Sequence, residues 1–142
     1  IIEDYFGSFP SIRSFIDDTL CSARENGYVE TIFGRRRYIP DIGSHNANVR
    51  AVAERNAVNA PIQGTAADII KIAMIRIYEA FKKEGLKSKM ILQVHDELNF
   101  SVLPEEQEKV EKIVLEEMQN AYPLRVPLIA DSGWGDNWLE AH

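Results

Sequence analysis

The stretch QVHDELNF, residues 93–100, joins an apolar run to a run in which every second residue is apolar. The residues before it, KMIL at 89–92, are apolar after the first lysine, and the alternation continues to Val102. Short apolar runs and a period of two residues are both typical of β-strands. The stretch therefore predicts a tight β-hairpin. Its tip carries three residues with ionisable side chains, His95, Asp96 and Glu97.

The segments around this hairpin indicate a fold class. Residues 65–85 are apolar on nearly every face and end at a glycine, which predicts a largely buried helix. Pro104 begins an acidic amphipathic helix that we expect to run to Tyr122, and residues 126–135 are predicted as a last strand. The order helix, strand, strand, helix, strand is that of a split βαβ fold without its first strand. We therefore predict an α+β fold, with an antiparallel sheet packed against helices.

The N-terminal half adds helices and a second hairpin. Residues 11–26 keep the helical spacing of apolar residues, with Ser11 as the expected N-cap and Gly27 as the end. The stretch YVETIFGRRRYIP, residues 28–40, predicts two strands joined by a turn at residues 33–35.

The composition is that of one ordinary globular domain. The 142 residues are 45% hydrophobic and 27% charged, so we expect a single domain over residues 1–142. No apolar run is long enough to cross a bilayer, and the single cysteine, Cys21, excludes an internal disulfide. These features predict a cytoplasmic protein. The first residues, from Ile1 onward, resemble the inside of a helix, which suggests a fragment of a longer protein.

The net charge of −6 is unevenly distributed along the chain. Residues 31–56 contain five arginines and two acidic residues, a balance of +3, whereas residues 96–142 contain eleven acidic and three basic residues, a balance of −8. The overall acidity argues against a nucleic-acid partner, but the basic segment keeps that partner open.

The two neighbouring acids at the hairpin tip, Asp96 and Glu97, suggest a site for Mg²⁺. Carboxylate oxygens suit this ion, which keeps several waters and shares its shell with substrate phosphates. Two such ions clamp the attacking and leaving oxygens of a phosphoryl transfer, but this requires carboxylates from two chain segments, and only one is evident. The alternative is that Asp96 is simply a good turn residue. We interpret His95 as a hydrogen-bonded residue at the strand end, because hard cations prefer oxygen ligands to imidazole.

Three hydrogen-bond donors, Arg55, Asn59 and Gln63, are spaced four residues apart in and just after a predicted alanine-rich helix at residues 49–60. Pro61 removes a backbone donor and is expected to bend or break this helix. On a continuous helix the three side chains would share one face. Such donors suit the DNA minor groove, where A·T and T·A pairs present the same acceptors. The alternative is a solvated polar stripe, with Gln63 capping the helix that follows Pro61.

The second hairpin carries three adjacent arginines, Arg35, Arg36 and Arg37. Guanidinium groups bind phosphates through paired hydrogen bonds, so these residues are candidates for contact with a nucleic-acid backbone. A charged hairpin edge that prevents aggregation is an equally good interpretation of these residues alone. Near the end of the chain, SGWGDNW at residues 132–138 offers two tryptophans that either stack on bases or pack the terminus onto the core.

Four stretches together resemble the C-terminal part of bacterial family A DNA polymerases. They are YVETIFGRRRYIPDI, AERNAVNAPIQGTAADIIK, QVHDEL and GWGDNW, in the order and at the spacing seen in that family. The similarity covers essentially all 142 residues, and the stretches APIQGTAADI and VHDE are highly specific together. The resemblance implies that the sheet belongs to a polymerase palm, flanked by additional N-terminal helices and the arginine-rich hairpin.

The resemblance implies a catalytic role for the hairpin tip. Asp96 is similar to the palm carboxylate that binds the catalytic metal ions, Glu97 to an acid that supports it, and His95 to a histidine near the primer terminus. The family's other metal-binding carboxylate and its nucleotide-binding helix have no counterpart in this sequence. We therefore expect two Mg²⁺ ions in the intact parent protein, only weak Mg²⁺ binding by this chain, and no polymerase activity from the isolated fragment.

The resemblance also implies a DNA-binding surface. The helical residues similar to those that contact the template–primer duplex near the active site are Arg55, Asn59 and Gln63. The hairpin is similar to one that lies close to the duplex, and its candidate DNA-binding residues are Arg35, Arg36 and Arg37. The expected activity of the parent is nucleotidyl transfer from a dNTP to a primer 3′-OH in DNA replication and repair. The alternatives are a non-catalytic nucleic-acid-binding module, which would carry aromatic residues on its central strands, and a metal-dependent nuclease, which would need more carboxylates near Asp96.

Overall fold

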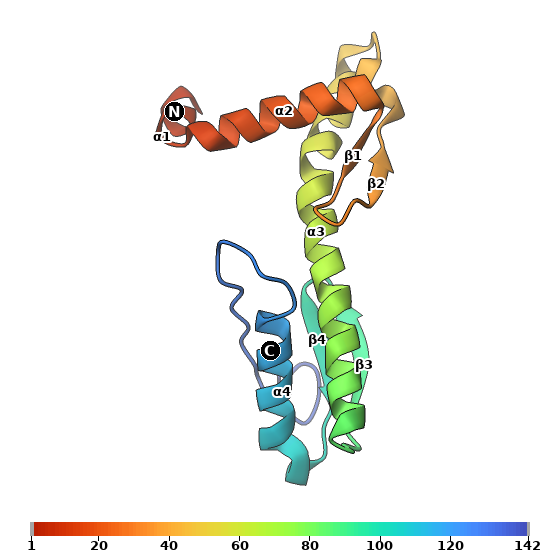
Figure 1. Ribbon diagram of the computed structural model, residues 1–142, viewed down its shortest axis with the longest axis vertical. Helices are drawn as coiled ribbons and strands as arrows, with labels where there is room; N and C mark the ends of the chain where they lie inside the picture. The colour runs from red at the N-terminus through yellow and green to blue at the C-terminus, as the bar shows by residue number, and fades with distance from the viewer. Residues whose placement is uncertain (1, 142) are drawn as a thin grey trace. The chain divides into compact units, whose positions relative to one another are not determined.

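The computed structural model describes residues 2–141, apart from the side chains at positions 2, 3 and 6. Contacts divide the chain into two compact units, Ile1–Ala66 and Ala67–His142 (Figure 1). Each unit combines helices with one two-stranded antiparallel sheet, which confirms the predicted α+β class. The single-domain expectation stays a prediction. No helix in the described part of the chain combines the length and apolar character that crossing a membrane requires.

The first unit consists of helices and a short hairpin. Its helices are α1 (Ile2–Ser8), α2 (Pro10–Asn26), the 3-10 helix η1 (Pro40–Gly43) and the beginning of α3 (Ala47–Lys83). Its strands are β1 (Tyr28–Glu30) and β2 (Arg36–Tyr38), which pair antiparallel. The core residues of this unit are Ala23, Val29, Ile39, Ile42, Ala53 and Ala57. Half of them are alanines, so small side chains from α2 and α3 make up much of this core.

Helix α2 ends where the sequence predicts but begins differently. Gly27 closes the helix with φ of 79°, a left-handed conformation that glycine adopts without strain, and its amide donates to the Ala23 carbonyl (2.8 Å). Ser11, the predicted N-cap, lies inside the helix. The reason is that Pro10 occupies the first turn, where its fixed φ and missing amide hydrogen are favourable.

Helix α3 continues through Pro61. The sequence predicted a bend or a break there, and the break is wrong. Proline removes one intrahelical hydrogen bond. The neighbouring turn compensates, because Ala57 is fully buried and Ala60 packs against the same core, and because alanine favours helix. The two helices predicted at residues 49–60 and 65–85 are therefore one.

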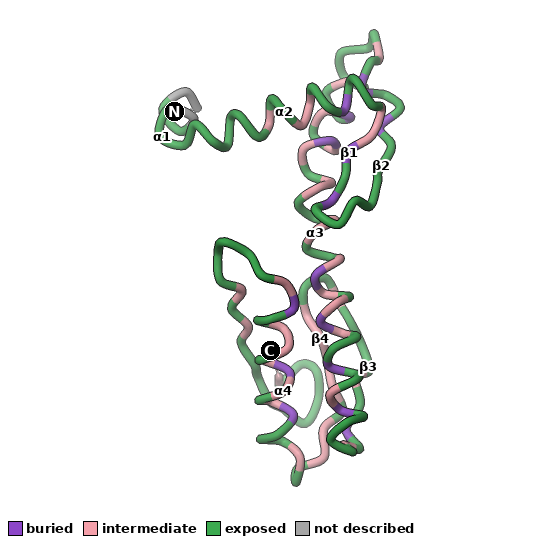
Figure 2. Tube along the Cα trace, viewed as in Figure 1, coloured by how far each residue is buried: buried purple, intermediate pink, exposed green. Residues whose placement is uncertain are grey.

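The second unit packs a longer hairpin on two helices. Its strands are β3 (Lys89–Val94) and β4 (Glu97–Ser101), and the 3-10 helix η2 (Pro104–Glu106) leads into α4 (Gln107–Gln119). The hairpin and the acidic helix agree with the sequence, although α4 ends three residues before the predicted Tyr122. The core of α3, α4 and the hairpin is centred on four buried residues, Ile77, Phe81, Val110 and Val114. Figure 2 shows buried positions recurring along α3 and α4.

Strand β3 contains a β-bulge. Met90 pairs with Phe100 and Leu92 pairs with Asn99, so the register shifts by one and Ile91 is the extra residue. The Ile91 side chain is 64% exposed. Met90 and Phe100 both pack against the core of the unit.

The base of the β3–β4 hairpin is fastened by the Glu106 carboxylate, which accepts bonds from the amides of Lys87 (3.1 Å) and Ser88 (2.9 Å). The buried Ser88 hydroxyl also donates to Glu106 (2.7 Å) and accepts from the Leu103 amide (3.1 Å). These bonds, the Ser88 hydroxyl first among them, lower the pKa of Glu106. We call the contacts of Glu106 with Lys87 and Ser88 the base latch.

The second half of α3 is less buried than its sequence predicts. Its buried positions recur at helical spacing and are Ile69, Ala73, Ile77 and Phe81. In contrast, Ile75 is 59% exposed and Tyr78 is 65% exposed. Within the described residues, only one face of this helix segment is therefore covered.

The predicted last strand is wrong, because residues 126–135 form no strand. In a split βαβ fold the last strand lies beside the first, and this sequence has no counterpart of that first strand. An isolated strand leaves its backbone groups without ladder partners. The Ala130 amide donates instead to the Gln119 side chain (3.2 Å).

Candidate functional site

The tip of the β3–β4 hairpin is a two-residue turn. Val94 pairs with Glu97, which leaves His95 and Asp96 as the loop. His95 has φ of 53°, a left-handed conformation that glycine or asparagine usually supplies in tight hairpin turns. The Gln93 side-chain amide donates to the His95 carbonyl (2.6 Å) and holds the loop. A non-glycine residue kept in this conformation indicates a constraint of the kind found at functional sites.

The three predicted catalytic residues lie together at this tip. His95 and Asp96 are exposed, and Glu97 is half-buried in β4. The Asp96 carboxylate is therefore open to a hydrated cation, and Mg²⁺ needs only one or two protein carboxylates when phosphates complete its shell. Within residues 2–141, no three potential ligands of the His, Cys, Asp and Glu types gather into a metal site. The tip fits Mg²⁺ as a partial site that needs a further ligand.

The predicted DNA-contact residues of α3 lie on one face. Arg55, Asn59 and Gln63 are all exposed, and the uninterrupted helix keeps their four-residue spacing in register. The alternative in which Gln63 caps a new helix after Pro61 is wrong, because no helix begins there. Whether these residues contact DNA stays a prediction.

The turn of the β1–β2 hairpin is fastened to α3. The Ile32 amide donates to Thr65 Oγ1 (3.2 Å), and Arg35 Nη2 donates to the Gly64 carbonyl (3.3 Å). Gly64 permits this approach, because a Cβ atom there would lie 2.7 Å from the Thr31 methyl carbon Cγ2. We call these contacts of residues 31–35 with Gly64 and Thr65 the turn latch.

The sequence pointed to Arg35 as a candidate DNA-binding residue, but it did not point to Thr31, Gly64 or Thr65, the other residues of the turn latch, as functional. Gly64 carried a signal, since glycine inside a helix is unfavourable by about 1 kcal/mol relative to alanine and such a position often marks a close approach. Thr31 and Thr65 carried no signal of this kind. Their positions depend on which segment packs against α3, and one sequence does not reveal that.

Arg36 is held within its own hairpin. Its Nε lies 3.1 Å from a Glu30 carboxylate oxygen, and its guanidinium carbon lies 4.3 Å from the centre of the Tyr28 ring. The Tyr38 hydroxyl and the Glu30 carboxylate raise the pKa of Arg36. This guanidinium therefore already has partners for its charge.

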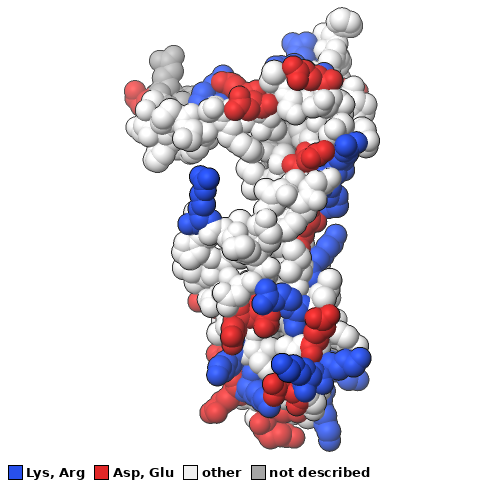
Figure 3. All heavy atoms as spheres, in the orientation of Figure 1, with Lys and Arg blue, Asp and Glu red and all other residues white. Residues whose placement is uncertain are grey.

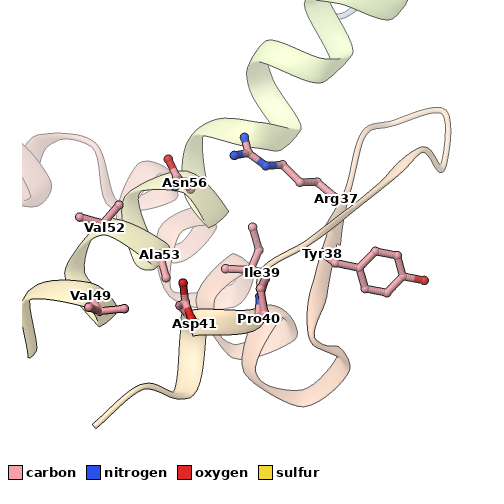
Figure 4. Close-up of a pocket in the computed structure, with 9 residues that line it drawn as sticks. All are labelled: Arg37, Tyr38, Ile39, Pro40, Asp41, Val49, Val52, Ala53 and Asn56. Carbon is pink, nitrogen blue, oxygen red and sulfur yellow. The ribbon is translucent and has the colours of Figure 1, made fainter. Parts of the chain in front are cut away.

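Two pockets flank the remaining arginine, Arg37. The first has a volume of about 300 Å³, and Arg37 lines it together with Asp41 and Asn56 over an apolar floor (Figure 4). The second has a volume of about 230 Å³ and is lined by all three arginines, Gln63 and Gly64. The structure thus brings the arginine hairpin and Gln63 to one pocket within the first unit.

The candidate residues form two groups, one in each unit. The arginines and the exposed face of α3 belong to the first unit, and the hairpin tip belongs to the second. On the face of the second unit shown in Figure 3, acidic side chains are intermingled with basic ones. On that face, the negative charge of residues 96–142 does not form one acidic surface.

Comparison with known proteins identifies the family. The sequence model of DNA polymerase family A matches residues 1–140. The chain belongs to DNA polymerase family A. The family A relatives include DNA polymerase I of Caldicellulosiruptor bescii, 51% identical over 139 residues that cover 98% of this chain and 16% of that protein. The thermostable DNA polymerase I of Thermus filiformis is 51% identical over 140 residues, covering 99% of this chain and 17% of that protein.

A solved family A structure is also similar. It is the POL domain of Pol1 from M. smegmatis in complex with DNA primer-template and dNTP, with a TM-score of 0.94 and 51% sequence identity. The match covers 99% of this chain and 25% of that chain. This family A chain spans about a sixth of the length of the curated relatives it matches.

Proposed function

We propose that the chain is part of the palm, with adjoining helices, of a bacterial DNA-directed DNA polymerase. The longer protein, called the parent polymerase below, acts in the cytoplasm in replication and repair. It transfers a nucleotidyl group from a dNTP to the 3′-OH of a primer paired with a template. The strongest support is the similarity, at a TM-score of 0.94, to a POL domain whose structure contains primer-template and dNTP.

In this proposal the β3–β4 tip serves the chemical step. Two Mg²⁺ ions, when bound, neutralise charge on the attacking and leaving oxygens of the phosphoryl transfer. Asp96 is the ligand of this chain, because its carboxylate is exposed at the tip. Glu97 supports it from β4, and His95 faces the primer end. The short loop holds these groups on a hairpin whose other end is packed and latched.

In the same proposal, the exposed face of α3 contacts the primer-template duplex. Arg55, Asn59 and Gln63 donate hydrogen bonds to minor-groove acceptors, which both orientations of a base pair present alike. These donors are paired at a correctly matched primer end and lose their acceptors at a distorted, mismatched one. The contact therefore senses pairing without reading sequence.

The 142-residue chain by itself is proposed to be inactive. It offers carboxylates for the catalytic metals from one segment only, and the described residues contain no complete metal site. Two-metal catalysis needs both the charge and the positioning that further carboxylates supply. Template-dependent extension by the purified 142-residue chain would contradict this part of the proposal.

The experiment that tests the proposed function is single-turnover primer extension by the parent polymerase. Asp96→Asn removes a metal ligand while keeping the shape of the side chain, and it should reduce the rate at least about 100-fold, since metal contact contributes several kcal/mol to the transition state.

Glu97→Gln is the matched control at the neighbouring position. As a supporting acid it should lose far less activity than Asp96→Asn. Equal losses would mean that the two acids share the metal or exchange roles. An Asp96→Asn variant with the wild-type rate would reject the palm assignment.

A further inference from the structure

The three adjacent arginines of the β1–β2 hairpin have different surroundings. Arg35 donates to the Gly64 carbonyl (3.3 Å), so its guanidinium is part of the turn latch. Arg36 pairs with Glu30 (3.1 Å) and lies over the Tyr28 ring (4.3 Å). The guanidinium groups of Arg35 and Arg36 are therefore engaged in contacts within the protein.

Arg37 differs from both neighbours. Its guanidinium has no hydrogen bond or ion pair with any residue in the described range 2–141. Figure 4 shows its side chain extending from β2 towards Asn56 on α3, whereas the Tyr38 ring points away. This is the alternation expected of neighbouring residues in a strand. Arg37 therefore presents a positive charge without a protein partner to the pockets on either side of it.

The groups around Arg37 suit an anion with several oxygen atoms. The amide side chains of Asn56, in the first pocket, and Gln63, in the second, add donors. The two pockets have three arginines but only two acids among their lining residues. Asp41 lines the first pocket, and Glu30, which lines the second, is paired with Arg36. A guanidinium stays charged at working pH and binds phosphate oxygens in pairs.

The shared pocket with Gln63 indicates which phosphate is bound. The minor groove is about 6 Å wide and is bordered by the backbone phosphates of both strands. A duplex whose minor-groove edge meets Gln63 therefore brings a phosphate to the pocket that Gln63 shares with Arg37.

We infer that Arg37 is the arginine of this hairpin that binds a DNA backbone phosphate, whereas Arg35 and Arg36 are positioning residues that fasten the hairpin. The inference rests on the proposed function, because it takes Gln63 to face the minor groove. The sequence offers the three arginines as equivalent candidates for DNA binding. In this inference one of them contacts DNA and the other two hold the hairpin in place.

The salt dependence of DNA binding tests this division. The dissociation constant of the parent polymerase for a primer-template is measured at several salt concentrations. Each phosphate contact contributes about 0.9 to the slope of log affinity against log salt for duplex DNA. Arg37→Gln should therefore reduce the slope by about 0.9. Arg36→Gln, the same substitution one residue away, should leave the slope unchanged.

Arg37→Lys provides a second variant that keeps the charge. Its slope should equal that of the unsubstituted enzyme, while its affinity falls severalfold at every salt concentration because the paired hydrogen bonds of the guanidinium are lost. An unchanged slope for Arg37→Gln overturns the inference and leaves the proposed function intact. An equal decrease for Arg36→Gln also overturns it. Failure of the unsubstituted enzyme to bind primer-template rejects the proposed function itself.

Discussion

The two hairpins of this chain are fastened at opposite ends. The β1–β2 hairpin is held at its turn by the turn latch, through Gly64 and Thr65 of α3. The β3–β4 hairpin is held at its base by the base latch, through Glu106, and its turn at His95 and Asp96 is exposed. Both are antiparallel two-stranded sheets, so the pairing alone does not explain the difference.

The position of each latch determines which side chains of the hairpin remain available for other partners. Among the described residues, the side chains of Asp96 and Arg37 have no hydrogen bond or ion pair, and neither residue belongs to a latch. Asp96 lies at the opposite end of its hairpin from the base latch, and Arg37 follows the latched turn on strand β2. The charged residues that belong to a latch, Arg35 and Glu106, use their side chains to fasten the hairpin.

Breaking the turn latch should have the largest effect on stability. Gly64→Ala places a Cβ atom 2.7 Å from the Thr31 methyl carbon. We expect a loss of about 1–3 kcal/mol in the free energy of unfolding, as for other overpacked sites. Urea unfolding of the chain, followed by circular dichroism, measures it.

Thr31→Ser supplies the matching rescue. Serine lacks the methyl group but keeps the hydroxyl that accepts bonds from the Phe33 and Arg35 amides (3.2 and 3.3 Å). In that background Gly64→Ala should be neutral or stabilising by up to about 1 kcal/mol, because alanine favours helix. If the double variant is as unstable as Gly64→Ala alone, the close approach is not the cause.

The stability of the β3–β4 hairpin should depend on the backbone conformation at its exposed turn rather than on close packing. His95 has φ of 53°, which a β-branched residue tolerates poorly. His95→Val should therefore be about 1–2 kcal/mol less stable than His95→Gly, since the left-handed conformation costs roughly that much. The same unfolding measurement compares the two variants. Equal stabilities would show that the turn relaxes to accept valine.

A substitution on the exposed face of α3 tests whether this face contacts DNA. Gln63→Ala in the parent polymerase should slow extension from a matched primer end by roughly fivefold, the equivalent of one hydrogen bond of about 1 kcal/mol. Extension from a mismatched end should change less, because that end does not use the contact. Rates are compared across all four terminal base pairs. A loss confined to one base pair would indicate sequence readout.

Breaking the base latch should have the smallest effect on the free energy of unfolding, and mainly at acidic pH. The pKa of Glu106 is lowered from its ordinary value of 4.5, chiefly by the Ser88 hydroxyl. Its contribution to stability is therefore fully present above about pH 4.5 and is lost as the pH falls through the lowered pKa. Glu106→Gln should flatten this acid-side decline in the free energy of unfolding.

The neighbouring exposed acid provides a control for this pH dependence. Glu105→Gln removes the same charge without touching the base latch, so the acid-side decline should persist. Glu84, whose pKa Lys109 lowers, remains in both variants and contributes equally to each curve. The prediction fails if both substitutions change the decline to the same extent.

Much of the fold was predictable because local patterns specify it. The alternation around Phe100, the glycine at position 27 and the acidic turn after Pro104 all act over a few residues, and each matches the structure. Two of the errors have a different cause, because they depend on contacts between distant segments. The continuity of α3 at Pro61 depends on packing of Ala57, and a last strand needs a partner strand that this sequence does not contain.

The candidate site was predictable in position rather than in detail. Spacing placed the acids at a hairpin tip and three donors on one face of a helix, and the structure has both arrangements. The sequence did not distinguish the three arginines, because identical neighbours in sequence acquire different partners only through folding. Glu30, Tyr28 and Gly64 make that distinction here.

The bulge at Ile91 has a consequence for association between copies of the chain. A two-stranded sheet has two open edges, and a regular edge with apolar residues invites another strand to pair with it. Ile91 and Leu92 are 64% and 49% exposed, so β3 carries apolar side chains where such pairing would begin. The extra residue interrupts the hydrogen-bonding repeat at that point and increases the local twist. This irregularity therefore makes β3 a poor template for pairing with a strand of another copy.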